Sequence, residues 1–513
     1  MKNLRKYTNQ FLCMGLLVAS YFFATLSSPL FPTNPWVDTN AMLTIGRAWL
    51  NGVVPFRDLF EQRGPTMYLI YMLAAWIHSN GFFGVFLLQI SAGFIGYFFL
   101  VKLTKLFLKN SPQSYWIALI AFSQIIASAA FQSGGSPEEF VAPFSLSLLY
   151  LIIKRLNTKT SFTLMEIFWQ GFALAFVFWI KYSLIGMWVG FFLFIGFSLL
   201  IQKRWQTFFK TTMTAFGGFF AVSLPILIYY QVVGGLRELI DDYFIVNLSS
   251  YTTQTQGLQR VTQIFMRMVG NASPHVIGVS TLLLVAFFVL KTTKLTRKDK
   301  GMLATIFFFS VFMVYFTGRP YYYYFLALTP FASVGTAVFF GRFFSKKCVC
   351  RYYILPIVIV CTLSMTTFQF KNRIHYGNLE IHSIYPITRQ FAEAMRIMKT
   401  EKSINMLQIG FLDMGFYLAA QTIPTARYFA NTNIPHANFP QLIRGQLEEV
   451  KKKNPEFVVL TSRKLPAATF TRFALEHQEA FTKEYIPKIL LKNYRIINQV
   501  GSGFTGYYLF QRR

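Results

Sequence analysis

The sequence predicts a polytopic α-helical membrane protein of about eleven spans, with interfacial helices in the first outer loop and a small α/β domain at the carboxy end. Three observations predict this class. Hydrophobic residues make up 54% of the 513 residues, and charged residues only 13%. Apolar runs recur through about the first 370 positions, after which the composition changes. Such a pattern is typical of a chain whose helices are mostly dissolved in lipid.

The amino terminus has a basic flank, Lys2, Arg5 and Lys6, followed by an apolar run from about 11 to 30. This run is longer than the apolar core of a cleaved signal peptide, so we predict a retained signal anchor. The predicted spans cover about 11 to 30, 83 to 101, 116 to 132, 140 to 153, 163 to 180, 184 to 201, 211 to 233, 273 to 290, 302 to 317, 321 to 341 and 352 to 370.

The segment Thr66–His78 is apolar but short. A helix of this length covers about 20 Å at about 1.5 Å per residue, less than the roughly 30 Å hydrocarbon core. We therefore predict that it lies at the interface. With a cytoplasmic amino terminus, the basic clusters then fall in cytoplasmic loops, where Asp299 is the only acid. This is the positive-inside pattern of a multi-pass protein of the cell membrane, and it makes the carboxy-terminal domain extracytoplasmic.

We predict two domains, a transmembrane domain over residues 1–370 and an extracytoplasmic domain over residues 371–513. The second alternates strand-like and helical segments, which suggests a small α/β domain. These segments are Ile404–Gly410, His436–Lys453, Pro455–Leu460, Ala467–His477 and Tyr507–Phe510. The domain has twenty basic and ten acidic residues, which favours anionic partners such as lipid headgroups or a phosphate-bearing polymer. A basic surface that lies on anionic lipid is the simpler alternative.

Several classes of chemistry find no support in the sequence. There is no Gly-rich phosphate loop after a strand, no His and Cys spacing typical of a metal site and no nucleophile elbow. We therefore predict neither soluble nucleotide chemistry nor a nucleic-acid partner. The sequence establishes no cofactor, although oxygen ligands from Asp38 and Glu138 could share a divalent metal ion.

The first outer loop holds the candidate catalytic residue, Asp38. It lies just beyond the first span and precedes a segment in which Met42, Ile45 and Trp49 share one helical face. A carboxylate held near the bilayer surface suits acid–base chemistry, and the alternative is that Asp38 caps this helix. The cluster Glu61-Gln62-Arg63 comes before Gly64-Pro65, which starts the interfacial helix.

Because Pro65 disfavours helix at Gly64, the charges of Glu61 and Arg63 belong to the turn. The planar guanidinium of Arg63 suits a phosphate, and a mutual Glu61–Arg63 ion pair is the alternative.

Further candidate substrate-binding residues lie in later outward loops: Glu138, Glu139, Lys181, Arg319, Tyr321 and Tyr323. Glu139 matches a capping box with Ser136, whereas Glu138 has no such role. Lys181 lies between two apolar stretches, where an ionisable group is a functional candidate, with snorkelling as the alternative. Four tyrosines in a row follow Arg319-Pro320, either as an aromatic belt or as the lining of a groove for a phosphate and a sugar ring.

This order of features resembles the GT-C membrane glycosyltransferases, which include protein O-mannosyltransferases and lipid A aminoarabinose transferases. The segments Asn51–Asp58 and Gly64–Tyr68 are similar to the first loop of that family, and Arg319–Pro330 is similar to a later segment that leads into a span. The likeness covers the layout of about 370 residues. The chain differs in having Asp38-Thr39 where some relatives carry paired acids and Tyr323 where His is common.

The resemblance implies transfer of a sugar, with inversion, from a polyprenyl-phosphate donor to an extracytoplasmic acceptor, here a cell-envelope glycopolymer, a glycolipid or a protein. In that scheme Asp38 would be the general base, and Arg63, with Lys181 or Arg319, would stabilise the departing lipid phosphate. A transporter or flippase of a lipid-linked saccharide is the alternative, although internal repeats typical of transporters are not visible. A ligase that joins preassembled glycans is a third hypothesis.

Overall fold

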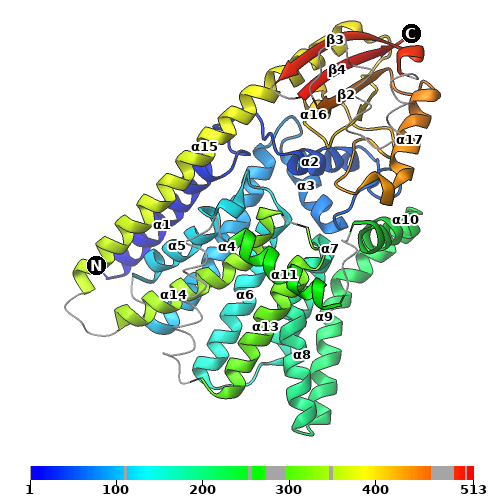
Figure 1. Cartoon of the computed structure of the whole chain (residues 1–513). Coiled ribbons are helices and arrows are strands. Elements are labelled where there is room, and N and C mark those ends of the chain that lie inside the picture. The colour runs from blue at the N-terminus through cyan, green and yellow to red at the C-terminus, as the bar shows by residue number, and fades with distance from the viewer. Residues whose placement is uncertain are drawn as a thin grey trace. The chain divides into compact units, whose positions relative to one another are not determined.

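The computed structural model describes residues 2–108, 113–251, 257–272, 295–319, 321–345, 351–463, 490–502 and 505–513. They form a mostly helical protein with several apolar helices and a small mixed sheet in the carboxy-terminal part (Figure 1). This confirms the predicted fold class in outline. The predicted span at 273 to 290 and the predicted helix Ala467–His477 lie outside the described residues.

Contacts within the chain divide it into two compact units, and both are discontinuous in sequence. Unit 1 comprises Met1–Leu30, Phe86–Ile228 and Thr253–His375, and unit 2 comprises Phe31–Val85, Tyr229–Thr252 and Tyr376–Arg513. Unit 2 therefore combines the predicted first outer loop with the carboxy-terminal residues. The predicted domain boundary at residue 370 stays a prediction.

Unit 1 is helical in its described residues. Its elements are α1 (Lys2–Ala24), α4 (Phe83–Leu108), α5 (Gln113–Ile126), η1 (Ala129–Phe131), α6 (Pro137–Thr158), α7 (Leu164–Ile180), η2 (Tyr182–Leu184), α8 (Gly186–Ile201), α9 (Trp205–Val232), α11 (Gly257–Ala272), α13 (Arg297–Tyr315), η4 (Tyr322–Leu328), α14 (Thr329–Ser345) and the first part of α15 (Arg351–Met398). The helices α4, α9 and α15 have their remaining residues in unit 2.

Glycines let α8 and α13 pack closely. A Cβ on Gly186 would lie 2.2 Å from the carbonyl oxygen of Phe309, and a Cβ on Gly190 would lie 2.7 Å from the Cα of Ile306. Both contacts are with backbone, which cannot rotate away as a side chain can. Small residues that bring helix backbones together are typical of helix pairs in membranes.

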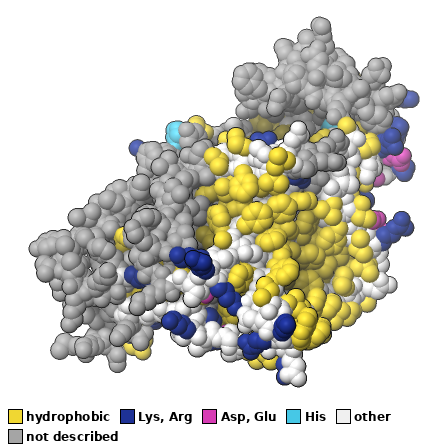
Figure 2. Space-filling view, turned by 60° about the horizontal axis from the view of Figure 1, so that its bottom comes forward, with side chains coloured by type: hydrophobic (Ala, Val, Ile, Leu, Met, Phe, Trp, Pro, Cys, Tyr) yellow, Lys and Arg dark blue, Asp and Glu magenta, His cyan; other side chains and the backbone are white. Residues whose placement is uncertain are grey.

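Three helical segments of the described chain are long and apolar enough to cross a membrane: Phe83–Leu108, Trp205–Val232 and Tyr322–Arg342. The second is the least buried, and its Phe209, Met213 and Phe216 are at least half exposed. Figure 2 shows one face of the molecule with a broad hydrophobic area, near which Lys and Arg side chains gather. A hydrophobic surface of this kind is suited to contact with lipid tails. The number of spans, eleven, stays a prediction.

Unit 2 begins with two helices that pack against each other, α2 (Val37–Leu50) and α3 (Pro65–Ile77). A Cβ on Gly46 would lie 2.5 Å from the backbone carbon of Tyr71, so the two backbones almost touch there. The helix predicted at Thr66–His78 is thus present as α3, with Pro65 in its first turn after Gly64 as the N-cap. Its interfacial position stays a prediction.

The rest of unit 2 is a short helical insertion and an α/β part. Its further elements are α10 (Leu236–Ile240), the π-helix η3 (Asp241–Tyr251), the end of α15, β1 (Met406–Ile409), α16 (Phe416–Ala420), η5 (His436–Asn438), α17 (Pro440–Lys451), β2 (Phe457–Arg463), β3 (Tyr494–Ser502) and β4 (Thr505–Arg512). The sheet order is β1-β2-β4-β3, with β1 parallel to β2 and the other pairs antiparallel.

The core of unit 2 joins its two ends. Buried residues of the sheet and α17, among them Leu407, Val458 and Leu442, form one hydrophobic cluster that also contains Phe60 of the first loop. The Phe60 ring lies 4.7 Å from the ring of Phe439 between centroids, and the Phe60 amide donates to the carbonyl of Arg427. The first loop is therefore an integral part of this fold.

Candidate active site

Asp38 lies in the first turn of α2, and its side chain is almost completely buried. The N-cap of α2 is Trp36, without a side-chain hydrogen bond, so the interpretation of Asp38 as a capping residue was wrong. The preceding turn is fixed by two asparagines. The side chain of Asn40 donates to the carbonyls of Asn34 and Trp36, and the side chain of Asn34 accepts from the Trp36 amide. Asp38 therefore has a rigid support.

Arg63 joins Asp38 to Glu61. One terminal nitrogen of its guanidinium lies 2.8 Å from Oδ1 of Asp38, and the other lies 2.6 Å from Oε2 of Glu61. The predicted Glu61–Arg63 ion pair is thus present, but it is largely buried and shared with Asp38. Charge-assisted hydrogen bonds to both arms of one planar group fix the positions of both carboxylates.

The turn before α3 explains why these side chains meet. Pro65 disfavours the helical conformation at the residue before it, and Gly64 is extended with ψ 160°. Residues 61–63 therefore stay outside α3. Tyr68, one turn into α3, donates from its hydroxyl to Oε2 of Glu61 at 2.6 Å. Burial, and then the charge of Glu61, raises the pKa of Tyr68 well above its ordinary value, so the phenol keeps its proton for this hydrogen bond.

A small cavity of about 30 Å³ adjoins this network. Its lining includes Asp38, Glu61 and Arg63 from the first loop, and Asp413 and Asn431 from the carboxy-terminal part. A cavity of this size holds about two water molecules. Within the described residues, Asp38 makes its recorded ion pair through Oδ1, which leaves Oδ2 available to accept from a molecule in the cavity. The side-chain oxygen of Asn431 is buried and has no partner among the described residues.

Asp413 is a second buried carboxylate beside the cavity. It accepts from the hydroxyl of Thr44 at 2.6 Å and from the amide of Gly415 at 2.8 Å. Burial raises the pKa of Asp413, and these two hydrogen bonds act in the opposite direction. Because Thr44 belongs to α2, this contact attaches the helix that presents Asp38 to the loop after β1.

A separate cluster in unit 1 contains Glu138, Lys181 and Tyr323. Lys181 Nζ lies 2.6 Å from Oε1 of the fully buried Glu138. It also lies 4.1 Å from the ring centroid of Tyr324 and 5.5 Å from that of Tyr323. Lys181 stands in the break between α7 and η2 and has an extended backbone. The lysine is therefore held in an ion pair and over aromatic faces, where cation–π attraction adds to the pairing.

The remaining predicted residues of unit 1 fall into two groups. Glu139 accepts from the side-chain amide of Gln89 and from the amide of Gly135, while the Ser136 hydroxyl accepts from the Glu139 amide as N-cap of α6. These contacts hold Glu139 at the start of α6, and its role in substrate binding stays a prediction. Tyr321 stacks on Tyr323 with 5.6 Å between the ring centroids, and Arg319 is half-buried at the end of the described segment 295–319.

Sequence reasoning missed Asp413, Thr44 and Asn431. Asp413 follows the predicted strand Ile404–Gly410 closely, and polar residues just after a strand are a usual position for site residues, so that signal was present. Nothing in the local sequence marks Thr44, because its partner is 369 residues away. Asn431 lies in a loop without a motif.

Comparison with solved structures identifies the fold. The crystal structure of ArnT from Cupriavidus metallidurans bound to undecaprenyl phosphate aligns with a TM-score of 0.63, 10% sequence identity and coverage of 97% of each chain. The apo state of the same protein aligns with a TM-score of 0.61, the same identity and the same coverage. No family model matches the chain, and no curated protein matches it significantly.

The chain therefore has the fold of ArnT over nearly its full length, at an identity that shows the fold alone. This confirms the resemblance inferred from the sequence at the level of fold.

Proposed function

We propose that this protein is a membrane glycosyltransferase that moves a sugar from a polyprenyl-phosphate donor to an extracytoplasmic acceptor, a cell-envelope glycopolymer or glycolipid. Asp38 is the general base in this proposal. The observation that carries it is the position of Asp38: a buried carboxylate, held by Arg63, that lines a cavity. The fold of ArnT, which binds undecaprenyl phosphate in its crystal structure, supports the donor class.

The chemistry is a single displacement at the anomeric carbon. Asp38 accepts the proton of the acceptor hydroxyl while the oxygen of that hydroxyl forms the new glycosidic bond to the anomeric carbon. The bond between the anomeric carbon and the phosphate oxygen breaks, and the polyprenyl phosphate leaves with that electron pair. Attack from the face opposite the leaving group inverts the anomeric centre.

Arg63 contributes in two ways. Its ion pair keeps the Asp38 carboxylate oriented toward the cavity, and its positive charge favours the negative charge that develops on the departing phosphate. A guanidinium suits this second role because its planar donors match phosphate oxygens. Glu61 and Tyr68 hold the guanidinium in place from the other side.

We assign binding of the donor phosphate to Lys181 as a separate proposal. Its ammonium is paired with Glu138 and lies over the rings of Tyr323 and Tyr324. A cation with aromatic neighbours suits a phosphate with a sugar ring attached. Arg319, close in sequence to these tyrosines, is proposed to assist.

The membrane arrangement belongs to the same proposal: eleven spans, a cytoplasmic amino terminus, α2 and α3 at the outer interface and the sheet outside the membrane. The positive-inside charge pattern supports it. A bound divalent ion stays a prediction. Among the described residues, no group of three His, Cys, Asp or Glu side chains could hold a metal ion.

Transfer by the purified, reconstituted protein tests the function. Polyprenyl-phosphate sugars are supplied with candidate acceptors, and product formation is followed by mass spectrometry. Asp38→Asn keeps the shape of the side chain but removes the base, and we expect it to abolish transfer while the protein inserts and folds normally. Glu448→Gln, at an exposed acid on α17, is the matched control and should retain activity.

The alternatives give different results in this assay. A transporter or flippase would move the lipid-linked saccharide across vesicles without any new glycosidic bond. A ligase would work only with a pyrophosphate-linked oligosaccharide donor. Full transfer activity in Asp38→Asn would refute the assignment of the base.

A further inference from the structure

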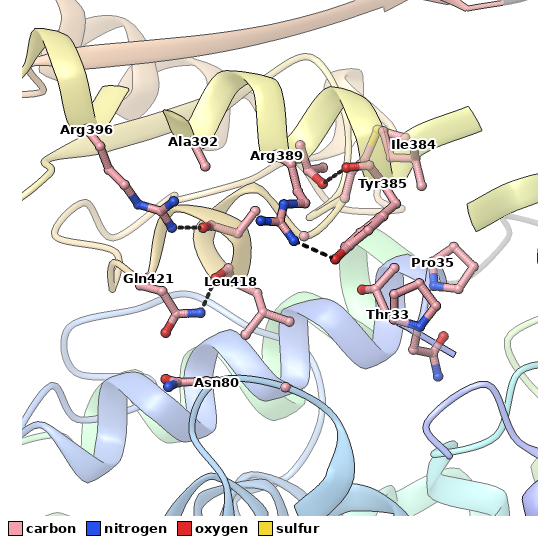
Figure 3. A pocket seen from close by; sticks show the side chains of 17 residues that line it. Thr33, Pro35, Asn80, Ile384, Tyr385, Arg389, Ala392, Arg396, Leu418 and Gln421 are labelled. Carbon is pink, nitrogen blue, oxygen red and sulfur yellow. Dashed lines mark hydrogen bonds between the residues drawn. The ribbon is translucent and has the colours of Figure 1, made fainter. Parts of the chain in front are cut away.

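A second, larger cavity, with a volume of about 220 Å³, lies in unit 2. Figure 3 shows the side chains that line it. Asn34 and Pro35, just before α2, line it together with Met414 and Gly415, whereas Asp38 and Asp413 line the small cavity. The two cavities therefore share the same two stretches of chain, residues 34–38 and 413–415. We call the larger one the arginine groove.

Two arginines of α15 give the groove its charge. Arg389 and Arg396 are seven residues apart, which places them on one face of the helix about 10 Å apart along its axis. Figure 3 shows both side chains extending from α15 toward Leu418 and Gln421. None of the residues that line the groove is acidic. Glu393, whose charge acts on Arg389, is exposed and does not line it.

The arginines are positioned by neutral acceptors and make no ion pair recorded in the described chain. The Arg396 guanidinium donates to the carbonyl of Ala419 at 2.7 Å, and the Arg389 guanidinium donates to the hydroxyl of Tyr385 at 3.0 Å. These single hydrogen bonds to neutral acceptors orient each guanidinium. Five N–H groups on each side chain leave donors for a ligand.

The remaining lining side chains indicate the type of ligand. Apart from the two arginines, the polar ones are Thr33, Asn34, Asn80, Tyr385, Thr388 and Gln421. Amides and hydroxyls match the hydroxyl groups of a sugar or polyol better than they match acyl chains. The volume is below the roughly 300–1,000 Å³ typical of drug-sized ligands, so the groove fits one sugar-sized group.

We propose that the arginine groove binds an anionic, hydroxyl-rich group of the acceptor, a phosphate- or carboxylate-bearing sugar or polyol unit, and so brings the adjacent acceptor hydroxyl to Asp38. The inference rests on the proposed function for the identity of the ligand as acceptor. Binding itself is testable without any transfer reaction.

The test is direct binding by the purified full-length protein in detergent, measured by calorimetry. The probe is a short synthetic oligomer of glycerol phosphate, compared with a neutral oligosaccharide of similar length and with vesicles containing phosphatidylglycerol. We expect the oligomer to bind in a salt-dependent way and Arg389→Gln/Arg396→Gln to bind it at least roughly tenfold more weakly. The matched control is Arg444→Gln/Lys451→Gln, which removes two exposed charges at the same spacing on α17 and should stay within about twofold of the wild type.

Three results would overturn the proposal: equal oligomer binding by the groove variant and the wild type, an equal loss in the control variant, or equal binding of the neutral oligosaccharide. Vesicle binding that needs the two arginines, without oligomer binding, would point to a lipid headgroup and also overturn it. Asp38→Asn is expected to bind the oligomer normally. A failure of the proposed function would therefore show as absent transfer with intact binding, whereas a failure of the groove would show in binding itself.

Discussion

Replacement of Arg63 by Gln tests the network around Asp38 most sharply. The substitution removes the one cation that both Asp38 and Glu61 contact, and these carboxylates are only 5% and 10% exposed in their side chains. Breaking a buried ion pair on one side typically costs about 3–5 kcal/mol. Because the Arg63 side chain is itself 16% exposed, water can enter the gap, and we expect a loss of about 3 kcal/mol.

Thermal unfolding of the full-length protein in detergent measures this loss. For a folded unit of about 200 residues, 3 kcal/mol corresponds to a fall in Tm of about 6–12 °C. The double variant Arg63→Gln/Glu61→Gln removes one charge of each sign, so we expect it to recover part of the loss, with a coupling of about 1–2 kcal/mol. The sum of the two single effects is the reference for this coupling.

Two outcomes would contradict the reasoning. An unchanged Tm in Arg63→Gln would mean that the carboxylates do not depend on the guanidinium. If the double variant is no more stable than the sum of the two single effects predicts, Arg63 and Glu61 act independently, although their charged atoms are 2.6 Å apart. Transfer activity should fall in Arg63→Gln in either case, since the charge that favours the departing phosphate is gone.

Three further predictions concern other parts of the molecule. Lys181→Gln should lower the Tm more than Glu138→Gln, because the fully buried Glu138 is left without its cation whereas Lys181 is 19% exposed; equal losses would contradict this. Burial raises the pKa of Asp242 to about 7, although Asp242 is paired with Arg427. A raised pKa in the folded state stabilises the fold fully below the ordinary pKa of 3.8, and this stabilisation is lost as the pH rises through about 7. The Tm should therefore fall less between pH 5 and 8 in Asp242→Asn than in the wild type, and identical profiles would refute the shift. Gly46→Ala forces a Cβ against the backbone of α3 and should cost about 1–3 kcal/mol in thermal unfolding, whereas Gly15→Ala, which meets open space, is the control.

Local sequence signals predicted the elements of unit 2 well where the pattern is strong. Pro65 after Gly64 predicted the start of α3, and the strand-like segment Ile404–Gly410 predicted β1. The strand β3 was missed because it is partly exposed, with Ile496 39% exposed, and a bulge next to Ile496 interrupts its pairing. A bulged, partly exposed strand shows little of the regular alternation that marks a strand in the sequence.

Contacts within the site could be predicted only between residues that are close together in the sequence. Glu61 and Arg63 are two positions apart, so their ion pair could be weighed as an alternative from the sequence. The bridge from Arg63 to Asp38, and the pair of Glu138 with Lys181, depend on helix packing that no local pattern specifies. Those residues could be selected as candidates by charge and position, but their partners could not.

The discontinuity of unit 2 has a consequence for biosynthesis. The hydrogen bond of Thr44 cannot form until Asp413, which is 369 residues further along the chain, has been synthesised. The hydrophobic surroundings of Phe60 likewise need the strands of the carboxy-terminal part. Contacts this distant in sequence form late, since long loops must close first. A ribosome that stalls before β2 and β4 are made would therefore release a molecule whose first loop has no core to join. Quality control by proteases should detect such truncated products at that loop, long before any defect in the helices is visible.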